Sequence, residues 1–273
     1  MTRSQPHLLI LGMGYTASRL AVHLRGEGWR VTGVRRSADA DTLAFDDDSA
    51  VRAAIVGASH ILSSVPPEGE ADPVLTRYGA AIAAAPALWS GYLSSTGVYG
   101  DAAGAWVDEA SPIGLGRRTA RAAADADWGA LRADMRRFRL PGIYGPGRSA
   151  LDRVREGKAH RIDLPGQIFS RAHVDDIVAG VIASIHAGPT GVYNLSDDLP
   201  CAQNDVIEAA CDLLGLPWPP MQTVEQAALS PMALGFYVEN RRVANGRAKR
   251  LLGWAPRYPT YWEGLRACLS GGQ

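Results

Sequence analysis

The chain has 273 residues, of which 47% are hydrophobic, and its 28 Lys and Arg residues balance its 28 Asp and Glu residues. That length and apolar content suit one large α/β domain, or a nucleotide-binding core that carries a smaller lobe. The zero net charge argues against a dedicated nucleic-acid or membrane-surface binder. Three scattered cysteines and six histidines without metal-ligand spacing argue against a disulfide framework and against a metal site.

The N-terminal residues show no signal-peptide pattern, because the polar residues 1–6 lead into a short apolar run, Leu8–Leu11, that enters a glycine turn. No apolar stretch approaches the ~20 residues that cross a bilayer. We therefore expect a cytoplasmic protein that binds a small-molecule substrate, with neither nucleic acid nor membrane as a partner. The oligomeric state stays open, with a homodimer as one alternative.

The first half of the chain alternates short apolar runs with longer amphipathic ones, which is typical of βαβ units. Strands are predicted at His7–Leu11, Arg30–Val34, Leu43–Phe45, His60–Val65 and Trp89–Ser95, and in a segment that ends at Leu140. Helices are predicted at Tyr15–Gly26, Val51–Val56, Val74–Ala84 and Arg117–Trp128. This alternation predicts an α/β fold with a doubly wound, mostly parallel sheet.

The pattern loosens after about residue 145. The predicted elements are a helix at Asp175–Ile185, a strand at Val192–Leu195, a helix at Asn204–Leu214 that Gly215 ends, and two short helices within Gly246–Leu269. We expect residues 1–145, joined by about 168–187, to form the nucleotide-binding core. Residues 146–167 and 188–273 are expected to form a smaller, C-terminal substrate-binding lobe.

A glycine motif, Gly-Met-Gly-Tyr-Thr-Ala at residues 12–17, follows the first predicted strand and opens the first predicted helix. That context is the one a dinucleotide-binding Rossmann fingerprint requires. Gly12 permits the tight turn, and Gly14 lets the backbone approach a pyrophosphate at the helix N-terminus. Tyr15 and Thr16 follow in the same site, and Ala17 still allows close packing of helix on strand. The alternative is a glycine turn without a ligand.

The second predicted strand is followed by Arg35, Arg36 and Ser37, with no carboxylate before Asp39. An NAD site usually has an acidic residue there to hold the ribose 2′-hydroxyl. Arginine instead binds a 2′-phosphate in bidentate fashion. These three residues therefore predict NADP as the cofactor, with NAD as the alternative. The other interpretation is that both arginines are simply solvated.

The fifth predicted strand ends in hydroxyl residues, Ser94, Ser95 and Thr96. Side chains at the carboxyl end of a parallel strand face the crevice in which ligands of doubly wound folds bind. The alternative is an ordinary turn rich in Ser and Thr.

The stretch Ser-Ser-Thr-Gly-Val-Tyr-Gly at 94–100 resembles the Ser-Ser-x-x-Val-Tyr-Gly of extended short-chain dehydrogenases/reductases, the NAD-dependent epimerase/dehydratase family. Three more segments resemble that family in the same order. They are Arg-Leu-Pro-Gly-Ile-Tyr-Gly-Pro at 139–146, Arg-Ala-His-Val-Asp-Asp at 171–176 and Tyr-Asn-Leu at 193–195. The four matches span nearly the whole chain, and they specify the family but no substrate.

The resemblance implies roles for individual residues. Ser95 and Thr96 would lie where the family's catalytic Ser/Thr contacts the reacting hydroxyl or carbonyl, and Tyr144 and His173 would complete the catalytic set. Tyr144 would also flank the nicotinamide, and Arg148 would face the substrate. The resemblance also implies further cofactor-binding residues, namely Ser64, Val65, Ser94, Arg117, Gly142 and Ile143.

One departure from the family concerns its general acid/base, a Tyr followed four residues later by a Lys. In this chain Leu115 stands for the Tyr and Thr119 for the Lys, and residues 100–127 contain neither Tyr nor Lys. The chain therefore resembles the atypical branch that lacks the Tyr-x-x-x-Lys pair. Arg117 and Arg118 could supply the positive charge of the Lys but no exchangeable proton.

Other residues on the crevice-side loops could act as the acid, namely Tyr99, Asp101, Glu109, Tyr144 and His173. The first functional hypothesis is an NADP-dependent oxidoreductase or epimerase that acts on a hydroxyl or carbonyl substrate such as a nucleotide sugar. The alternative is a non-catalytic, NADP-binding sensor or regulatory protein, which the missing Tyr and Lys favour.

Overall fold

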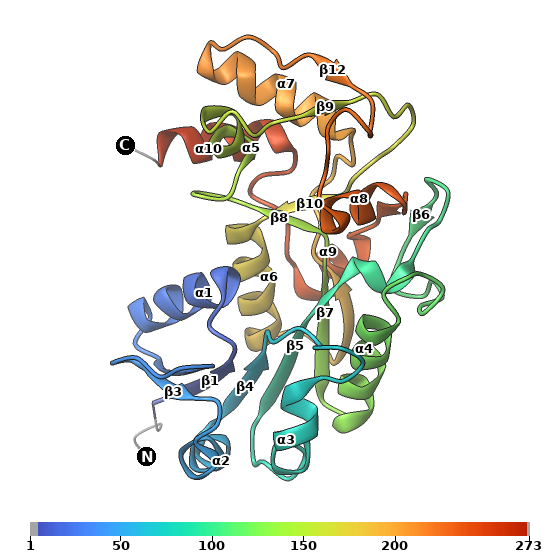
Figure 1. Cartoon of the computed structure of the whole chain (residues 1–273). Helices are drawn as coiled ribbons and strands as arrows, with labels where there is room; N and C mark the ends of the chain where they lie inside the picture. The colour runs from blue at the N-terminus through green and yellow to red at the C-terminus, as the bar shows by residue number, and fades with distance from the viewer. Residues whose placement is uncertain (1–4, 272–273) are drawn as a thin grey trace.

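A seven-stranded sheet forms the centre of the computed structural model, which describes residues 5–271 (Figure 1). The strand order is β11-β7-β5-β4-β1-β2-β3, and all neighbouring strands are parallel. The strands are β1 His7–Leu11, β2 Arg30–Arg35, β3 Thr42–Ala44, β4 His60–Ser63, β5 Trp89–Ser95, β7 Met135–Leu140 and β11 Gly191–Asn194. The predicted doubly wound parallel sheet is therefore confirmed.

Both faces of the sheet are covered by helices through separate apolar clusters. Leu8 and Ile10 of β1 face one cluster, whereas Leu9 and Leu11 face the other, because successive strand residues point to opposite faces. The helices of the first cluster are α1 (Tyr15–Gly26), α6 (Val174–His186) and α9 (Gly246–Leu252). The helices of the second are α2 (Asp48–Gly57), α3 (Pro73–Ala83) and α4 (Thr119–Leu131). Burial on both faces explains why the four residues Leu8–Leu11 of β1 are all apolar.

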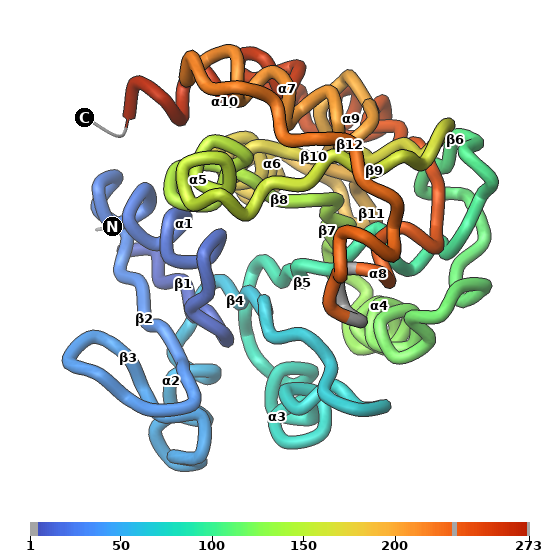
Figure 2. Tube along the Cα trace, turned by 45° about the horizontal axis from the view of Figure 1, so that its top comes forward, coloured from blue at the N-terminus to red at the C-terminus, as the bar shows by residue number. Residues whose placement is uncertain are grey.

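A smaller group of elements lies beyond the carboxyl ends of the strands, at the top of Figure 1 and of Figure 2. Its helices, α5 (Ala150–Arg155), α7 (Gln203–Leu214) and α10 (Tyr261–Ser270), share an apolar cluster of their own. Three two-stranded parallel sheets complete the fold: β8 (Gly142–Tyr144) with β10 (Arg171–His173), β9 (Arg161–Ile162) with β12 (Met221–Gln222), and β6 (Trp106–Val107) with β13 (Arg242–Val243). The boundaries proposed for the core and the lobe stay predictions.

Several helix boundaries differ from those predicted. Helix α2 begins at Asp48 rather than Val51, because the Asp47 carboxylate accepts a hydrogen bond from the Ala50 N–H at 3.0 Å and caps the helix. Helix α4 begins at Thr119, two residues later than predicted, and continues to Leu131. The short strands β8 and β10, the turn η1 (Thr96–Tyr99) and helix α8 (Pro231–Tyr237) were not predicted.

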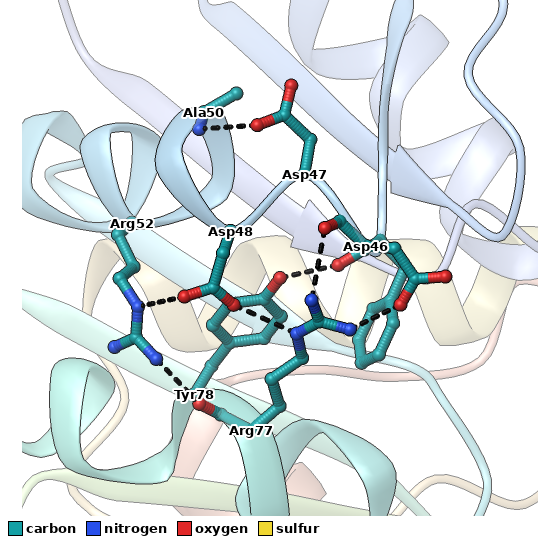
Figure 3. A network of polar contacts seen from close by, with 8 residues as sticks. Asp46, Asp47, Asp48, Ala50, Arg52, Arg77 and Tyr78 are labelled. Carbon is teal, nitrogen blue, oxygen red and sulfur yellow. Dashed lines mark hydrogen bonds and ion pairs between the residues drawn. The ribbon is translucent and has the colours of Figure 1, made fainter.

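A network of ion pairs ties the loop before α2 to α3 (Figure 3). The Arg77 guanidinium on α3 donates to Asp48 at 2.9 Å and also pairs with Asp46. Arg52 donates to the other oxygen of Asp48 at 2.6 Å. Each of these arginines therefore has a carboxylate partner.

Within residues 5–271, no helix combines the length and the apolar character needed to cross a membrane. The same residues contain no group of His, Cys, Asp and Glu side chains that could hold a metal ion.

Candidate functional site

A cavity of about 980 Å³ opens at the carboxyl edge of the central sheet. It lies where the strand order reverses, since β1 has β2 on one side and β4 on the other. Open α/β sheets bind their ligands at this point. The predicted site residues that line the cavity are Gly14, Tyr15, Thr16, Ala17, Ser64, Ser94, Ser95, Thr96, Arg117, Gly142, Ile143 and Tyr144. Those that do not are Gly12, Arg35, Arg36, Ser37, Val65 and His173.

Gly12 makes the sharp turn out of β1 with a φ of +94°. A Cβ atom at this residue would lie 2.8 Å from Val65 Cγ2 and 3.0 Å from Ser64 Oγ. The Gly12 N–H donates to the Val34 carbonyl at 3.0 Å, and the Ser64 hydroxyl donates to the Gly12 carbonyl. Ser64 and Val65 therefore hold the turn in place, and only glycine fits its tightest residue.

Gly14 leaves open space at the start of α1. No atom lies within 4 Å of the place that its Cβ would occupy, and α1 has neither a side-chain cap nor an acidic residue in its first turn. The free N–H groups and the helix dipole there favour an anion. The Tyr15 hydroxyl donates to the Pro146 carbonyl at 2.9 Å and so links the glycine turn to the opposite wall of the cavity. These residues fit the pyrophosphate of a dinucleotide.

Arg35 and Arg36 lie at the carboxyl end of β2, and their side chains are 45% and 89% exposed. Their nearest carboxylate oxygens are those of Asp39, at 3.7 Å from Arg35, and Glu68, at 3.6 Å from Arg36. Exposed ion pairs of that length contribute little free energy. Both guanidinium groups are therefore available to a phosphate on the adenosine side of a cofactor.

Ser94 and Ser95 are neighbours with different surroundings. The buried Ser94 hydroxyl donates to the Asp125 carboxylate at 2.7 Å. Ser95 Oγ instead accepts a hydrogen bond from the Gly97 N–H at 3.1 Å and opens the turn η1. No described residue accepts its O–H proton, so Ser95 can donate to a ligand in the cavity.

A buried polar network supports the end of β5. The Asp125 carboxylate accepts from Arg139 Nη2 at 2.8 Å and from Arg137 Nη1 at 3.0 Å. Arg139 Nη1 donates to the Tyr99 hydroxyl at 3.1 Å, and that hydroxyl donates to Asn194 at 2.7 Å. Burial raises the pKa of Tyr99. Tyr99 is thus engaged in the scaffold, and it does not line the cavity.

Leu115 and Thr119, which the resemblance aligns with the family's Tyr and Lys, bring no side chain to the cavity. Leu115 is 76% exposed, and neither Leu115 nor Thr119 lines the cavity. The cavity walls contain no lysine among the described residues. Arg117 does line the cavity, where its guanidinium donates to the Gly235 carbonyl and lies 3.8 Å from Glu239.

His173 lies outside the cavity and is 1% exposed. Its Nδ1 accepts the Asp175 N–H at 3.2 Å and caps α6, while Nε2 faces Cys268 Sγ at 3.7 Å. Burial lowers the pKa of His173 to about 4, so the ring is neutral at neutral pH. His173 therefore caps α6 from outside the cavity, and its catalytic role stays a prediction.

Tyr144 lines the cavity, and its ring packs edge-to-face on His173 at 5.3 Å between centroids. Its hydroxyl is engaged with the Thr260 carbonyl at 3.5 Å and lies close to Gly264. Burial raises the pKa of Tyr144. The ring is therefore better placed to pack beside a ligand than to donate a proton to it.

Comparison with known proteins finds similar sequences and similar structures. No family model matches it. A curated relative, the 3-diazoavenalumate denitrifying reductase of a Streptomyces species, is 34% identical over 134 residues. This match covers 45% of the chain and 43% of the relative, so the chain aligns with less than half of that protein's length.

Among solved structures, a functionally unknown conserved protein from Silicibacter pomeroyi is 41% identical, with a TM-score of 0.90. The match covers 98% of this chain and 99% of that one. The chain belongs to the same family as this protein. Since that relative has no known function, membership supplies no activity.

More distant structures share the fold. A human epimerase family protein, solved with NADPH, has a TM-score of 0.78 at 18% identity and covers 97% of this chain and 99% of its own. MoeE5, solved with UDP-glucuronic acid and NAD, has a TM-score of 0.75 at 21% identity, with 97% and 98% covered. The structural neighbours are thus of the NAD-dependent epimerase/dehydratase type, as the sequence motifs predicted.

Three polar residues of the cavity were not among the site residues predicted from the sequence, although Arg118 was considered as a substitute for the charge of the Lys. Tyr237 of α8 lines the cavity, and its hydroxyl makes no hydrogen bond to another described residue. Burial raises the pKa of Tyr237, so it keeps its proton at neutral pH. The others are Arg118 and Arg121. The only sequence signal for Tyr237 was an aromatic pair in a segment without a predicted element.

Proposed function

We propose that the protein is an NADP-dependent oxidoreductase of the epimerase/dehydratase type that lacks the Tyr-x-x-x-Lys pair and acts on a carbonyl or hydroxyl substrate. One observation carries the proposal: a single cavity contains both the open Gly14 position at the start of α1 and the Ser95 hydroxyl at the end of β5. The first suits a pyrophosphate, and the second suits the reacting oxygen of a substrate.

The relatives support this proposal. The human epimerase family protein was solved with NADPH, and MoeE5 was solved with NAD and a nucleotide sugar acid. The Streptomyces relative is named as a reductase. A reduction needs orientation from the protein more than it needs a dedicated base, which suits a site without the Tyr-Lys pair.

When bound, NADPH supplies a hydride for the substrate carbon. The residues of the chain then have separate tasks. Backbone N–H groups at Gly14 and Tyr15 hold the pyrophosphate, and Arg35 holds the 2′-phosphate. Ser95 donates its hydrogen bond to the carbonyl oxygen and stabilises the negative charge that develops there. Tyr237, which stays protonated in the same cavity, is a source of the proton that completes the alcohol.

A second candidate function is an NADP-binding sensor without turnover. The observation that favours it is the exposed Leu115 in place of the expected proton donor, together with cavity walls that contain no lysine among the described residues. Cofactor binding would then be the whole activity.

The test is NADPH oxidation with a panel of carbonyl compounds and nucleotide sugars. Ser95→Ala should lower kcat about a hundredfold, which is typical for loss of an oxyanion donor, and leave the Kd for NADPH unchanged. Ser90→Ala is the matched control, because Ser90 lies on the same strand and its buried hydroxyl has no hydrogen-bond partner in the described part of the chain. Its kcat should equal that of the wild type.

Two results would contradict the assignment. If Tyr144→Phe abolishes turnover and Ser95→Ala does not, the hydroxyl that contacts the substrate is not Ser95. If no compound is reduced while every variant binds NADPH normally, the sensor function replaces the reductase.

A further inference from the structure

Four arginines lie on one wall of the cavity: Arg117, Arg118 and Arg121 around the start of α4, and Arg241. Glu239 is the carboxylate among them, and it pairs with Arg241 at 2.9 Å and with Arg117 at 3.8 Å. Neither Arg118 nor Arg121 has an ion pair or a side-chain hydrogen bond to any described residue. Among the described residues, this wall therefore carries two half-buried cations that have no ion-pair partner of their own.

The Arg118 side chain and the Ser95 hydroxyl both lie against Gly97. A Cβ built on Gly97 would be 2.8 Å from Arg118 Cδ, 3.4 Å from Arg118 Nη1 and 3.3 Å from Ser95 Oγ. On its other side the guanidinium lies over the Phe236 ring, 5.0 Å from the centroid. Contact on both sides restricts the planar group and leaves its N–H edges for a ligand.

The electrostatics of this wall favour an added negative charge. Burial lowers the pKa of Arg118, and the neighbouring Arg117 and Arg121 lower it further, which outweighs the opposing effect of Glu239. Desolvating a cation without a partner costs free energy, which an oxyanion with charge-assisted hydrogen bonds would offset. By contrast, Arg77 and Arg52 both pair with the Asp48 carboxylate (Figure 3).

We propose that Arg118 and Arg121 form a binding site for an oxyanion of the substrate, a carboxylate or a phosphate, next to the carbonyl that Ser95 contacts. That the bound oxyanion belongs to a substrate rests on the proposed function. The proposal adds that the enzyme selects anionic carbonyl compounds over neutral ones. The site is separate from the pyrophosphate site, which lies at the start of α1 beside Gly14.

Direct binding tests the site without any need for turnover. Calorimetry would measure inorganic pyrophosphate and malonate binding to protein saturated with NADPH, so that the cofactor site is filled. Wild type should bind at least one probe, and the preferred probe tells phosphate from carboxylate. Arg118→Gln and Arg121→Gln should each weaken binding about tenfold or more, since a charged hydrogen bond contributes about 1.5–3 kcal/mol.

The matched control is Arg30→Gln, which removes the same charge from an exposed residue at the amino end of β2. It should bind the probe as tightly as wild type. Thermal melting would confirm that each variant folds. If Arg118→Gln does not fold, Arg121→Gln still tests the proposal. The proposal is overturned if neither probe binds to wild type, or if Arg30→Gln loses as much affinity as the cavity variants.

A third result would also overturn it. If Arg118→Gln and Arg121→Gln lose NADPH affinity in parallel with probe affinity, the arginines hold the cofactor rather than the substrate. If the wild type binds a probe but reduces no compound, that result would instead refute only the proposed function. In the turnover assay, a 2-oxo acid should have a lower KM than its methyl ester, and Arg118→Gln should remove that difference in KM, whereas Arg30→Gln should keep it.

Discussion

Asp125 is the anionic centre of the network beneath the end of β5, so Asp125→Asn should destabilise the fold strongly. The carboxylate is 0% exposed and accepts from Arg139 at 2.8 Å, Arg137 at 3.0 Å and Ser94 at 2.7 Å. Removing one partner of a buried ion pair costs about 3–5 kcal/mol, because the other charge stays buried without compensation. Arg137 is 21% exposed and can reach water, so we expect the lower end, about 3 kcal/mol.

Urea unfolding followed by circular dichroism measures this loss. The matched control is Asp127→Asn, because Asp127 is an exposed residue on the same helix, and a surface substitution of this kind changes stability by less than about 0.5 kcal/mol. A loss below about 1 kcal/mol for Asp125→Asn would show that the buried arginines do not depend on this carboxylate.

Three further predictions concern glycines and a buried acid. Gly14→Val should abolish NADPH binding yet keep the wild-type melting temperature, and normal affinity would exclude this turn as the phosphate site. Gly12→Ala should cost at least about 1–2 kcal/mol in urea unfolding, because φ is +94° and the new Cβ meets Val65; an unchanged midpoint would contradict this. Burial raises the pKa of Asp197 to about 8, whereas the carboxyl of the unfolded chain ionises near pH 4. Between these pH values ionisation favours the unfolded state, so this group lowers the free energy of unfolding as pH rises. Asp197→Asn should therefore gain stability over wild type across that window, and a constant difference would refute the raised pKa.

Local signals were sufficient for the first strand, the first helix and the fifth strand. His7–Leu11, Tyr15–Gly26 and Trp89–Ser95 have the bounds that the sequence predicted. Each is a run of one periodicity that ends at glycine or hydroxyl residues, so no distant contact is needed to define it. The glycine turn and Ser95 accordingly meet in one cavity, as parallel strands require.

Features that depend on distant contacts could not be predicted. Strand β8 has three residues and exists because it pairs with β10, about 30 residues away. His173 resembled a site residue in sequence, yet packing against Tyr144, Tyr258 and Cys268 removes it from the cavity. Arg118 has no ion pair with a described residue because Glu239 pairs with Arg117 and Arg241 instead. These contacts join distant segments, so no local sequence pattern predicts them.

Cofactor binding between Gly14 and Arg35 is tested most directly by fluorescence titration of the wild type with NADPH and with NADH. One charged hydrogen bond to the 2′-phosphate contributes about 1.5–3 kcal/mol, so NADPH should bind about tenfold to a hundredfold more tightly. Arg35→Ala should erase most of that difference, whereas Arg30→Ala, on the same strand, should keep it. Equal affinities for the two nucleotides, or a preference for NADH, would contradict the assignment of Arg35 and of NADP.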